Sequence, residues 1–296
     1  MIAYLILAHR SPSLVRRLIS RLSTPEARFF VHIDKKVNFG PFQWALDEIE
    51  EERVFFVDRI DTRWGEYSLV EATLAGLRAA VAHRESFQHY VLLSGQSYPL
   101  ANADYIQECL ASHWDRSTME YRPLPEEKRT RIERYYFSLR GWRRVYPDSV
   151  PQSGLKHRLI QKACRRILSM PRIFPNGLQP YFGSQWWCLS AGAADYVLEY
   201  VRRHPEYVRF QKLCDVPDEM FFQSIFAGAD DAIRDAIDNR PFQFAIWEDG
   251  GQPSPVVLES RHFDQISASE SLFARKFDLG VDSKLLDRID NELIHV

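Results

Sequence analysis

The chain has 296 residues, of which 45% are hydrophobic and 26% charged, the composition of a soluble globular protein with a sizeable core. Its formal net charge of -2 argues against wholesale nucleic-acid binding. The opening MIAYLILAHR is too short to span a bilayer and lacks the features of a signal peptide. Four cysteines without a C-x-x-C pair indicate free thiols in a reducing compartment. We therefore expect a cytoplasmic protein that binds no nucleic acid.

The first half of the chain alternates predicted strands and helices. Ile2 to Ala8 is a continuous apolar run, as in a strand buried on both faces. Ser11 offers an N-cap and Pro12 a first helical position, and apolar residues at helical spacing follow through Leu22. The later elements are strands at Phe29 to Ile33, Val54 to Val57 and His89 to Leu93, and a helix at Ser68 to Val81. This order predicts an α/β fold with a mostly parallel sheet covered by helices.

Polar residues stand at the carboxyl ends of these predicted strands, where parallel sheets bind ligands. They are His9, Arg10, Asp34, Asp58, Asp61 and the run Gly95, Gln96 and Ser97. The alternative is that each of them only caps a strand or a helix.

The middle of the chain is predicted to contain a basic, partly loop-like insertion at about 138–180. A short charged helix is expected at Glu126 to Arg134, before the insertion. Leu155 to Met170 reads as an amphipathic basic helix. A solvated charged face is the commonest meaning of that pattern, and a helix lying on an anionic membrane surface is the alternative.

The last third predicts mixed structure. Strands are expected at Gln185 to Leu189 and Phe242 to Trp247, and helices at Ala191 to Arg203, from Asp218 to Ile225, and at Ser283 to Leu293. The sequence contains no internal repeat and no obvious linker. We therefore expect a single domain over residues 1–296.

Several catalytic motifs are missing from the sequence. It has no glycine-rich phosphate loop of either common kind, no G-x-S-x-G elbow and no H-E-x-x-H pair. It also has no D-x-D motif, by which many nucleotide-sugar transferases hold a metal against the diphosphate. If a diphosphate leaves here, another group must neutralise its charge.

Seven short segments, in order along nearly the whole chain, resemble glycosyltransferase family 14. They are Ala3-Tyr4 with Ala8-His9, Val31 to Asp34, Arg63-Trp64-Gly65 with Ser68 to Val70, Leu93 to Pro99, Gly183 to Trp186, Pro217-Asp218-Glu219, and Leu272 to Asp278. This family contains the core-2/I-branching β-1,6-N-acetylglucosaminyltransferases and the peptide O-xylosyltransferases. The resemblance implies a single GT-A-type (Rossmann-like) domain, an inverting reaction and no metal or other cofactor. The chain lacks the family's usual signal anchor and extra cysteines, so it looks like a bacterial member.

The resemblance assigns the reaction to a few residues. Glu219 falls on the catalytic base, and one carboxylate within reach of the attacking hydroxyl suffices for direct displacement. Lys276 falls on the lysine that holds the diphosphate in the core-2 enzymes. The second cation of those enzymes has no counterpart near Pro255-Val256, and Arg275 and Arg261 are the nearest substitutes.

Further residues are expected to contact the two substrates. On the donor side they are His9, Arg10, Asp34, Trp64, Gly95, Arg275 and Lys276. On the acceptor side the resemblance aligns Glu120, Lys128, Arg131 and Trp247, and we add Gln185 and Trp186. A family tyrosine is replaced by Asp249, so a different acceptor is expected.

The sequence thus predicts an inverting, metal-independent transferase that moves N-acetylglucosamine or xylose from a UDP-sugar to a hydroxyl of a glycan or lipid-linked glycan. Peripheral contact with the inner membrane through the basic helix 155–170 is a linked hypothesis. One alternative is a non-catalytic nucleotide-sugar or carbohydrate-binding protein on the same fold. The other is a metal-dependent transferase of another GT-A family, which the missing D-x-D disfavours.

Overall fold

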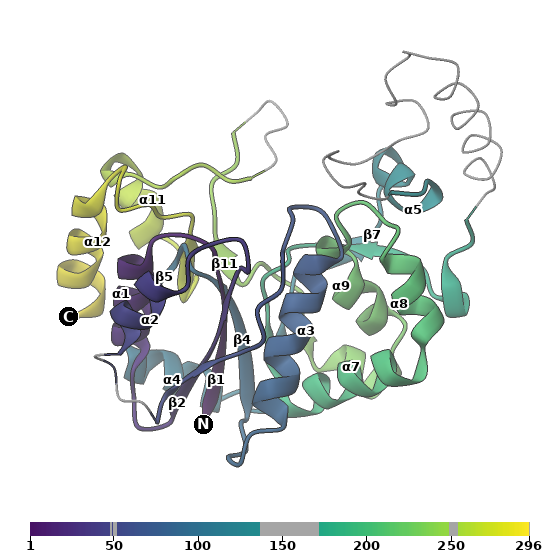
Figure 1. Ribbon diagram of the computed structural model, residues 1–296, viewed down its shortest axis with the longest axis horizontal. Helices are drawn as coiled ribbons and strands as arrows, with labels where there is room; N and C mark the ends of the chain where they lie inside the picture. The colour runs from purple at the N-terminus through teal and green to yellow at the C-terminus, as the bar shows by residue number, and fades with distance from the viewer. Residues whose placement is uncertain (48, 50–51, 137–171, 249–253, 296) are drawn as a thin grey trace.

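A seven-stranded sheet lies at the centre of the computed structural model, which describes residues 1–47, 49, 52–136, 172–248 and 254–295 (Figure 1). Its strands, in spatial order, are β10 (Ile237–Asp238), β6 (Ser117–Thr118), β9 (Cys188–Ser190), β4 (His89–Ser94), β1 (Ile2–Ala8), β2 (Ala27–Ile33) and β3 (Val54–Phe56). Strands β4, β1, β2 and β3 are parallel, whereas β9 is antiparallel to both of its neighbours. The predicted α/β fold with a mostly parallel sheet is therefore confirmed.

Helices cover both faces of this sheet, and β1 explains why. Ala3 and Leu5 face one apolar cluster with α3 (Ser68–Val81), while Tyr4 and Ile6 face another with α1 (Pro12–Leu22). Successive side chains of a strand point to opposite faces, so a strand covered on both sides is apolar throughout. The other covering helices are α2 (Gly40–Leu46), α4 (Ala103–Ala111), α7 (Ala191–Arg203), α8 (Pro205–Gln211) and α9 (Phe221–Ala227) (Figure 1).

Two strands of the C-terminal part form a second, three-stranded sheet together with a strand that follows β4. Its spatial order is β11 (Gln243–Phe244), β12 (Phe273–Arg275) and β5 (Ser97–Pro99). Because β5 follows β4 in the chain and β12 pairs with it antiparallel, the segment after β12 is held beside the carboxyl end of β4. Tyr98 and Phe277 pack here with α11 (Phe263–Ser267), α12 (Ser283–Ile289) and η5 (Asp290–Ile294), and η4 (Ser260–His262) directly precedes α11.

Strands β7 (Arg122–Pro123) and β8 (Tyr181–Phe182) form a two-stranded sheet, and the remaining elements are short helical segments. These are η1 (Glu126–Lys128), α5 (Thr130–Glu133), η2 (Pro175–Gly177), η3 (Pro217–Glu219) and α10 (Asp231–Asp235). The short charged helix expected at Glu126 to Arg134 is thus present as η1 followed by α5. The basic helix expected at 155–170, most of the proposed insertion and Asp249 lie outside the described residues.

Several predicted boundaries need correction. The strand expected from Gln185 begins only at Cys188, and the one expected over Phe242 to Trp247 is confined to β11. The helix expected from Asp218 is a 3-10 turn, with α9 starting at Phe221. The helix expected to run to Leu293 is α-helical only as far as Ile289, where a π-helical turn takes over.

Two sequence expectations about single side chains have different outcomes. Ser11 is the N-cap of α1, but its hydroxyl makes no capping bond and only its backbone carbonyl accepts, from Leu14 and Val15. The thiols of Cys109, Cys188 and Cys214 are free, as expected, and Cys164 lies outside the described residues. Within the described part of the chain, no helix has the length and apolarity that crossing a membrane requires.

Candidate active site

The predicted strand-end residues gather at one edge of the main sheet. His9 and Arg10 follow β1, Asp34 follows β2, and Gly95 follows β4. The backbone N–H groups of Asp34 and Gly95 donate to the Ala8 and Leu7 carbonyls, at 2.9 and 2.8 Å, so the three strand ends are tied together. This edge is the position at which parallel sheets bind ligands.

Asp34 is buried and fully engaged. Its carboxylate accepts hydrogen bonds from the Lys36 backbone N–H at 2.8 Å, from Lys36 Nζ at 3.0 Å and from the Thr62 hydroxyl. Burial acts to raise the pKa of Asp34, but these hydrogen bonds outweigh it and the pKa is lowered. Lys36 also pairs with Asp61 at 3.2 Å. Asp34 therefore joins the loop after β2 to the 61–65 loop, which carries the exposed Trp64.

Lys276 follows β12 and faces the same edge. The segment is fixed by Gln96, whose carbonyl accepts from the Phe277 N–H and whose side-chain amide donates to the Phe277 carbonyl, both at 2.9 Å. Desolvation lowers the pKa of Lys276, and the charges of Arg10 and Arg275 lower it further. Arg10 is held beside this segment by Asp278 at 3.3 Å. Arg10, Arg275 and Lys276 thus form one group of cations.

Two other donor-side candidates border this group. Desolvation and the charge of Arg10 lower the pKa of His9, which favours the neutral ring. At Gly95, an added Cβ would lie 2.9 Å from the Ala8 Cβ and 3.1 Å from a Val15 methyl. Close packing against β1 and α1 therefore accounts for the glycine at this position.

The backbone around Glu219 is held from both sides. Val216, just before the turn η3, has a φ of 48° and donates its N–H to the Gly65 carbonyl at 3.0 Å. A β-branched residue in the left-handed region costs on the order of 1–3 kcal/mol, which the surrounding structure must offset. Beyond the turn, the Glu219 carbonyl accepts from the Gly183 N–H at 2.9 Å. A Cβ on Gly183 would lie 1.8 Å from the Glu120 carbonyl, so only glycine fits between these two segments.

The Glu219 carboxylate is partly exposed and forms an ion pair with Arg131, with 2.7 Å between Oε2 and Nη1. Arg131 lies on α5, whose end is fixed because the Arg131 carbonyl accepts from the Asp215 N–H at 3.0 Å. Arg131, an acceptor-side candidate, is therefore brought to Glu219 from a distant part of the chain, and the Glu120 backbone lies against Gly183.

Arg275, one of these cations, also lies close to Glu219. Its guanidinium lies over the Trp186 ring, 4.7 Å from the ring centroid. Burial lowers the pKa of Arg275 to about 10, and the nearby Glu219 charge opposes this shift. Arg275 Nε and the side-chain nitrogen of Gln185, which precedes Trp186, are buried and have no hydrogen-bond partner among the described residues. Buried donors of this kind are costly unless a ligand or water satisfies them.

The remaining candidate residues differ in their surroundings and in their exposure. Lys128 is close to Arg131, and both lie over the ring of Phe182, a residue that sequence reasoning missed although it adjoins the quoted Gly183 segment. Trp247 is 58% exposed and follows β11. Arg261 is exposed and pairs with Glu259 at 2.8 Å. Of the two proposed substitutes for the second cation, Arg275 lies near Trp186 and Glu219, whereas Arg261 is paired with Glu259.

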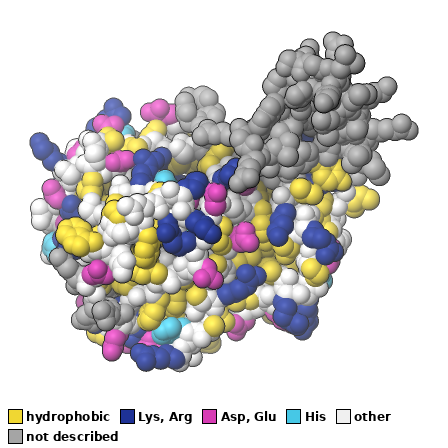
Figure 2. Space-filling model, in the orientation of Figure 1, with side chains coloured by type: hydrophobic (Ala, Val, Ile, Leu, Met, Phe, Trp, Pro, Cys, Tyr) yellow, Lys and Arg dark blue, Asp and Glu magenta, His cyan; other side chains and the backbone are white. Residues whose placement is uncertain are grey.

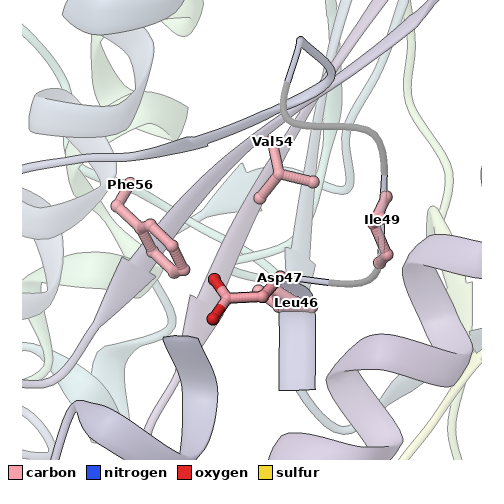
Figure 3. A pocket seen from close by; sticks show the side chains of 5 residues that line it. All are labelled: Leu46, Asp47, Ile49, Val54 and Phe56. Carbon is pink, nitrogen blue, oxygen red and sulfur yellow. The ribbon is translucent and has the colours of Figure 1, made fainter. Parts of the chain in front are cut away.

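Figure 2 shows Lys and Arg side chains next to Asp and Glu side chains in the middle of one face, between α2 and α3. A separate pocket is lined by Leu46, Asp47, Ile49, Val54 and Phe56, at the edge strand β3 (Figure 3). None of the predicted site residues lines it. Among the described residues, no group of three or more His, Cys, Asp or Glu side chains could hold a metal ion.

Residues 2–267 match the family model described as "Core-2/I-Branching enzyme". The chain is also similar to two curated proteins named xylosyltransferase 1. The human protein is 20% identical over 309 residues, which cover 98% of this chain and 30% of that protein. The rat protein is 20% identical over 312 residues, which cover 99% of this chain and 35% of that protein. The chain thus spans about a third of the length of these relatives.

Among solved structures, a 4-diphosphocytidyl-2C-methyl-D-erythritol synthase from Anaerococcus prevotii matches with a TM-score of 0.35 and 10% identity. The match covers 70% of this chain and 75% of that one. The fold class rests on the strand pairing described above.

Proposed function

The chain belongs to the Core-2/I-branching enzyme family of glycosyltransferases, and on that premise we propose that it transfers a sugar from a UDP-sugar to a hydroxyl of a glycan or lipid-linked glycan, with inversion at the anomeric carbon. The observation that carries this proposal is the position of Glu219. Its partly exposed carboxylate stands between the cations that follow β1 and β12 and the basic side chains of η1 and α5. A base between a donor site and an acceptor site is the arrangement that direct displacement needs.

In the proposed step, the acceptor oxygen attacks the anomeric carbon of the donor sugar from the face opposite the diphosphate. The bond from that carbon to the diphosphate oxygen breaks, and UDP leaves with the bonding electrons. The hydroxyl proton passes to a carboxylate oxygen of Glu219, which must lie within about 2.6–3.2 Å of the attacking oxygen. Arg131 keeps this carboxylate in one direction through its ion pair.

The charge that develops on the departing UDP needs neutralisation. Lys276 and Arg10 supply two positive charges at the carboxyl end of β1, and Arg275 supplies a third, nearer to Glu219. Cations placed in advance where charge develops stabilise a transition state without reorganisation. We therefore propose that these side chains take the role that a metal ion has in D-x-D transferases, and that the reaction is metal-independent.

The buried donors of Arg275 and Gln185 suit a ligand rich in hydroxyl groups, and Trp186 and Trp247 offer flat apolar faces for a sugar ring. Glu120 can accept bonds from sugar hydroxyls. The relatives are named xylosyltransferases and the family is named for branching enzymes, so UDP-xylose and UDP-N-acetylglucosamine are the donors to test first.

The test is a screen of nucleotide sugars for UDP release, with and without acceptors, followed by NMR of the new glycosidic bond. We expect turnover of at least one UDP-sugar with inverted configuration. Glu219→Gln should lower turnover by at least about a hundredfold while UDP affinity is unchanged. Glu133→Gln, at an exposed carboxylate near Arg129, is the matched control and should behave as wild type. UDP binding with no turnover of any donor would instead indicate a non-catalytic binding protein.

A further inference from the structure

Three cations converge on one aromatic ring beside Glu219. The guanidinium of Arg122 lies 5.6 Å from the centroid of Phe182, Lys128 Nζ lies 3.8 Å from it, and the Arg131 guanidinium 5.3 Å. The ring and the three cations come from four short elements, β8, β7, η1 and α5. Arg122 is directly opposite Phe182 in the β7–β8 pair. We call Arg122, Lys128 and Arg131 the Phe182 cation cluster.

The charge of this cluster is poorly compensated within the described residues. Arg131 pairs with Glu219, but neither Arg122 nor Lys128 makes an ion pair with a described carboxylate. The carboxylate of Glu126, on the same segment, forms an ion pair with Arg129 at 3.0 Å. Desolvation and the charges of Arg131 and Arg122 lower the pKa of Lys128, although Glu219 opposes the shift. Bringing like charges together costs free energy that a bound anion would recover.

Packing alone does not account for the cluster. A cation over an aromatic face is attracted to the ring, and one cation per face is enough to obtain this attraction. Three cations around one ring add mutual repulsion. Arginine presents a planar fork that fits carboxylate and phosphate oxygens, and lysine adds a compact point charge. This combination is typical of an anion-binding site.

We propose that the acceptor carries an anionic group, a carboxylate or a phosphate on a sugar, which the Phe182 cation cluster binds next to the hydroxyl that is glycosylated. The proposal rests on the proposed function, because it places this group in the acceptor site. Arg131 belongs to the cluster and also pairs with Glu219, so the anion is only one side chain away from the base. The cluster selects the acceptor and fixes which of its hydroxyls reaches Glu219.

The experiment measures binding of three probes by isothermal titration calorimetry in saturating UDP, so that the donor-side cations are occupied. The probes are methyl β-D-glucuronoside, its neutral analogue methyl β-D-glucoside, and glycerol 1-phosphate. We expect at least one anionic probe to bind about tenfold or more tightly than the neutral one. That preference should fall as salt rises and vanish in the double variant Arg122→Met/Lys128→Met. The preferred probe distinguishes a carboxylate acceptor from a phosphate acceptor.

Arg129→Met is the control, because Arg129 lies between the same elements but pairs with Glu126. It should keep the preference for the anionic probe. The proposal is overturned if neither anionic probe binds wild type more tightly than methyl glucoside does, or if the double variant keeps the preference. UDP affinity and UDP-sugar hydrolysis are measured in parallel on the wild-type protein. A failure of the proposed function would appear there, separately from a failure of anion binding.

Discussion

Arg131 and Glu219 are 88 residues apart in the sequence and form an ion pair of 2.7 Å at the centre of the candidate site. The pair connects α5, which carries basic side chains, to the turn η3, which carries the proposed base. One guanidinium therefore holds the carboxylate in place and also belongs to the cluster around Phe182.

Removal of the Arg131 charge should affect catalysis more than donor binding. We expect Arg131→Met to lower kcat by about tenfold or more, because Glu219 loses the partner that fixes its direction, while UDP affinity stays unchanged. Arg131→Lys should recover only part of the rate, since an ammonium lacks the planar fork. Steady-state kinetics together with UDP titrations would check this. A kcat equal to that of wild type would contradict the positioning role of Arg131.

The cations beside β1 and β12 should recognise the diphosphate. Loss of a charge-assisted hydrogen bond costs about 1.5–3 kcal/mol, so Lys276→Met and Arg10→Met should each weaken UDP binding by roughly 10- to 150-fold. Binding of uridine, which has no phosphate, should not change. Arg261→Met serves as the control because Arg261 is exposed and pairs with Glu259. If uridine and UDP were weakened equally, the diphosphate assignment would be wrong.

Divalent metal should be dispensable if Arg10, Arg275 and Lys276 neutralise the leaving group. We expect UDP-sugar turnover by the wild-type protein to persist in excess EDTA. The measurement is UDP release over a range of EDTA concentrations, with manganese added back at the end. Complete loss of turnover that manganese restores would refute the metal-independent mechanism.

Gly183 should tolerate no side chain. A Cβ at this position would meet the Glu120 carbonyl at 1.8 Å, and the Gly183 N–H also holds the Glu219 backbone. We expect Gly183→Ala to destabilise the fold by about 1–3 kcal/mol or more and to reduce turnover in the fraction that folds. The matched control is Gly192→Ala in α7, where an added Cβ meets nothing within 4 Å and alanine favours the helix. Thermal unfolding of both variants, with activity measured at equal folded concentration, provides the comparison.

The stability of the C-terminal part should depend on pH through Asp290. Burial acts to raise the pKa of this carboxyl, but hydrogen bonds from Arg21, Tyr98 and Arg17 outweigh it, and the folded pKa lies below the ordinary 3.8. A carboxyl with a lowered pKa stabilises the fold above its unfolded pKa and loses that contribution as the pH falls through its folded pKa.

We therefore expect Asp290→Asn to lower the free energy of unfolding near neutral pH, and the difference from wild type to shrink below about pH 3.8. Urea unfolding at a series of pH values measures this difference. Asp287→Asn removes the exposed partner of Arg17 and should have little effect. A difference that does not vary with pH would show that Asp290 acts only through packing.

The elements that the sequence predicted well are those with a strong local pattern. The apolar run of β1 and the periodicity of α3 and α7 gave these three elements their observed bounds. β5 and β12 were missed because each has three residues, and their pairing joins Ser97 to Arg275 across most of the chain. A strand this short exists because of its partner, and no nearby residue signals it.

The candidate site divides in the same way. Residues at the ends of long strands, such as His9 and Asp34, were predictable because a parallel sheet places them at one edge. The partners of Glu219 were not, since Arg131 reaches it only through the tertiary fold and Phe182 has no charge or motif of its own. The Ser11 hydroxyl does not make the expected capping hydrogen bond. The Ser11 backbone is left-handed, with a φ of 53°, whereas a residue whose side chain caps a helix usually has an extended backbone.

The pairing of β12 with β5 has a consequence for how specificity can change. Lys276 is fixed to the end of β4 through Gln96, whereas Arg131 and Lys128 are carried on separate short elements around β8. The donor half of the site, with Lys276, and the acceptor half, with Lys128 and Arg131, meet at Glu219 and Arg275. Selection, or an engineer, can therefore exchange the η1–α5 segment to redirect the protein toward new acceptors and leave nucleotide recognition intact. Substitutions at Arg275, on the boundary between the two halves, are the ones expected to change both at once.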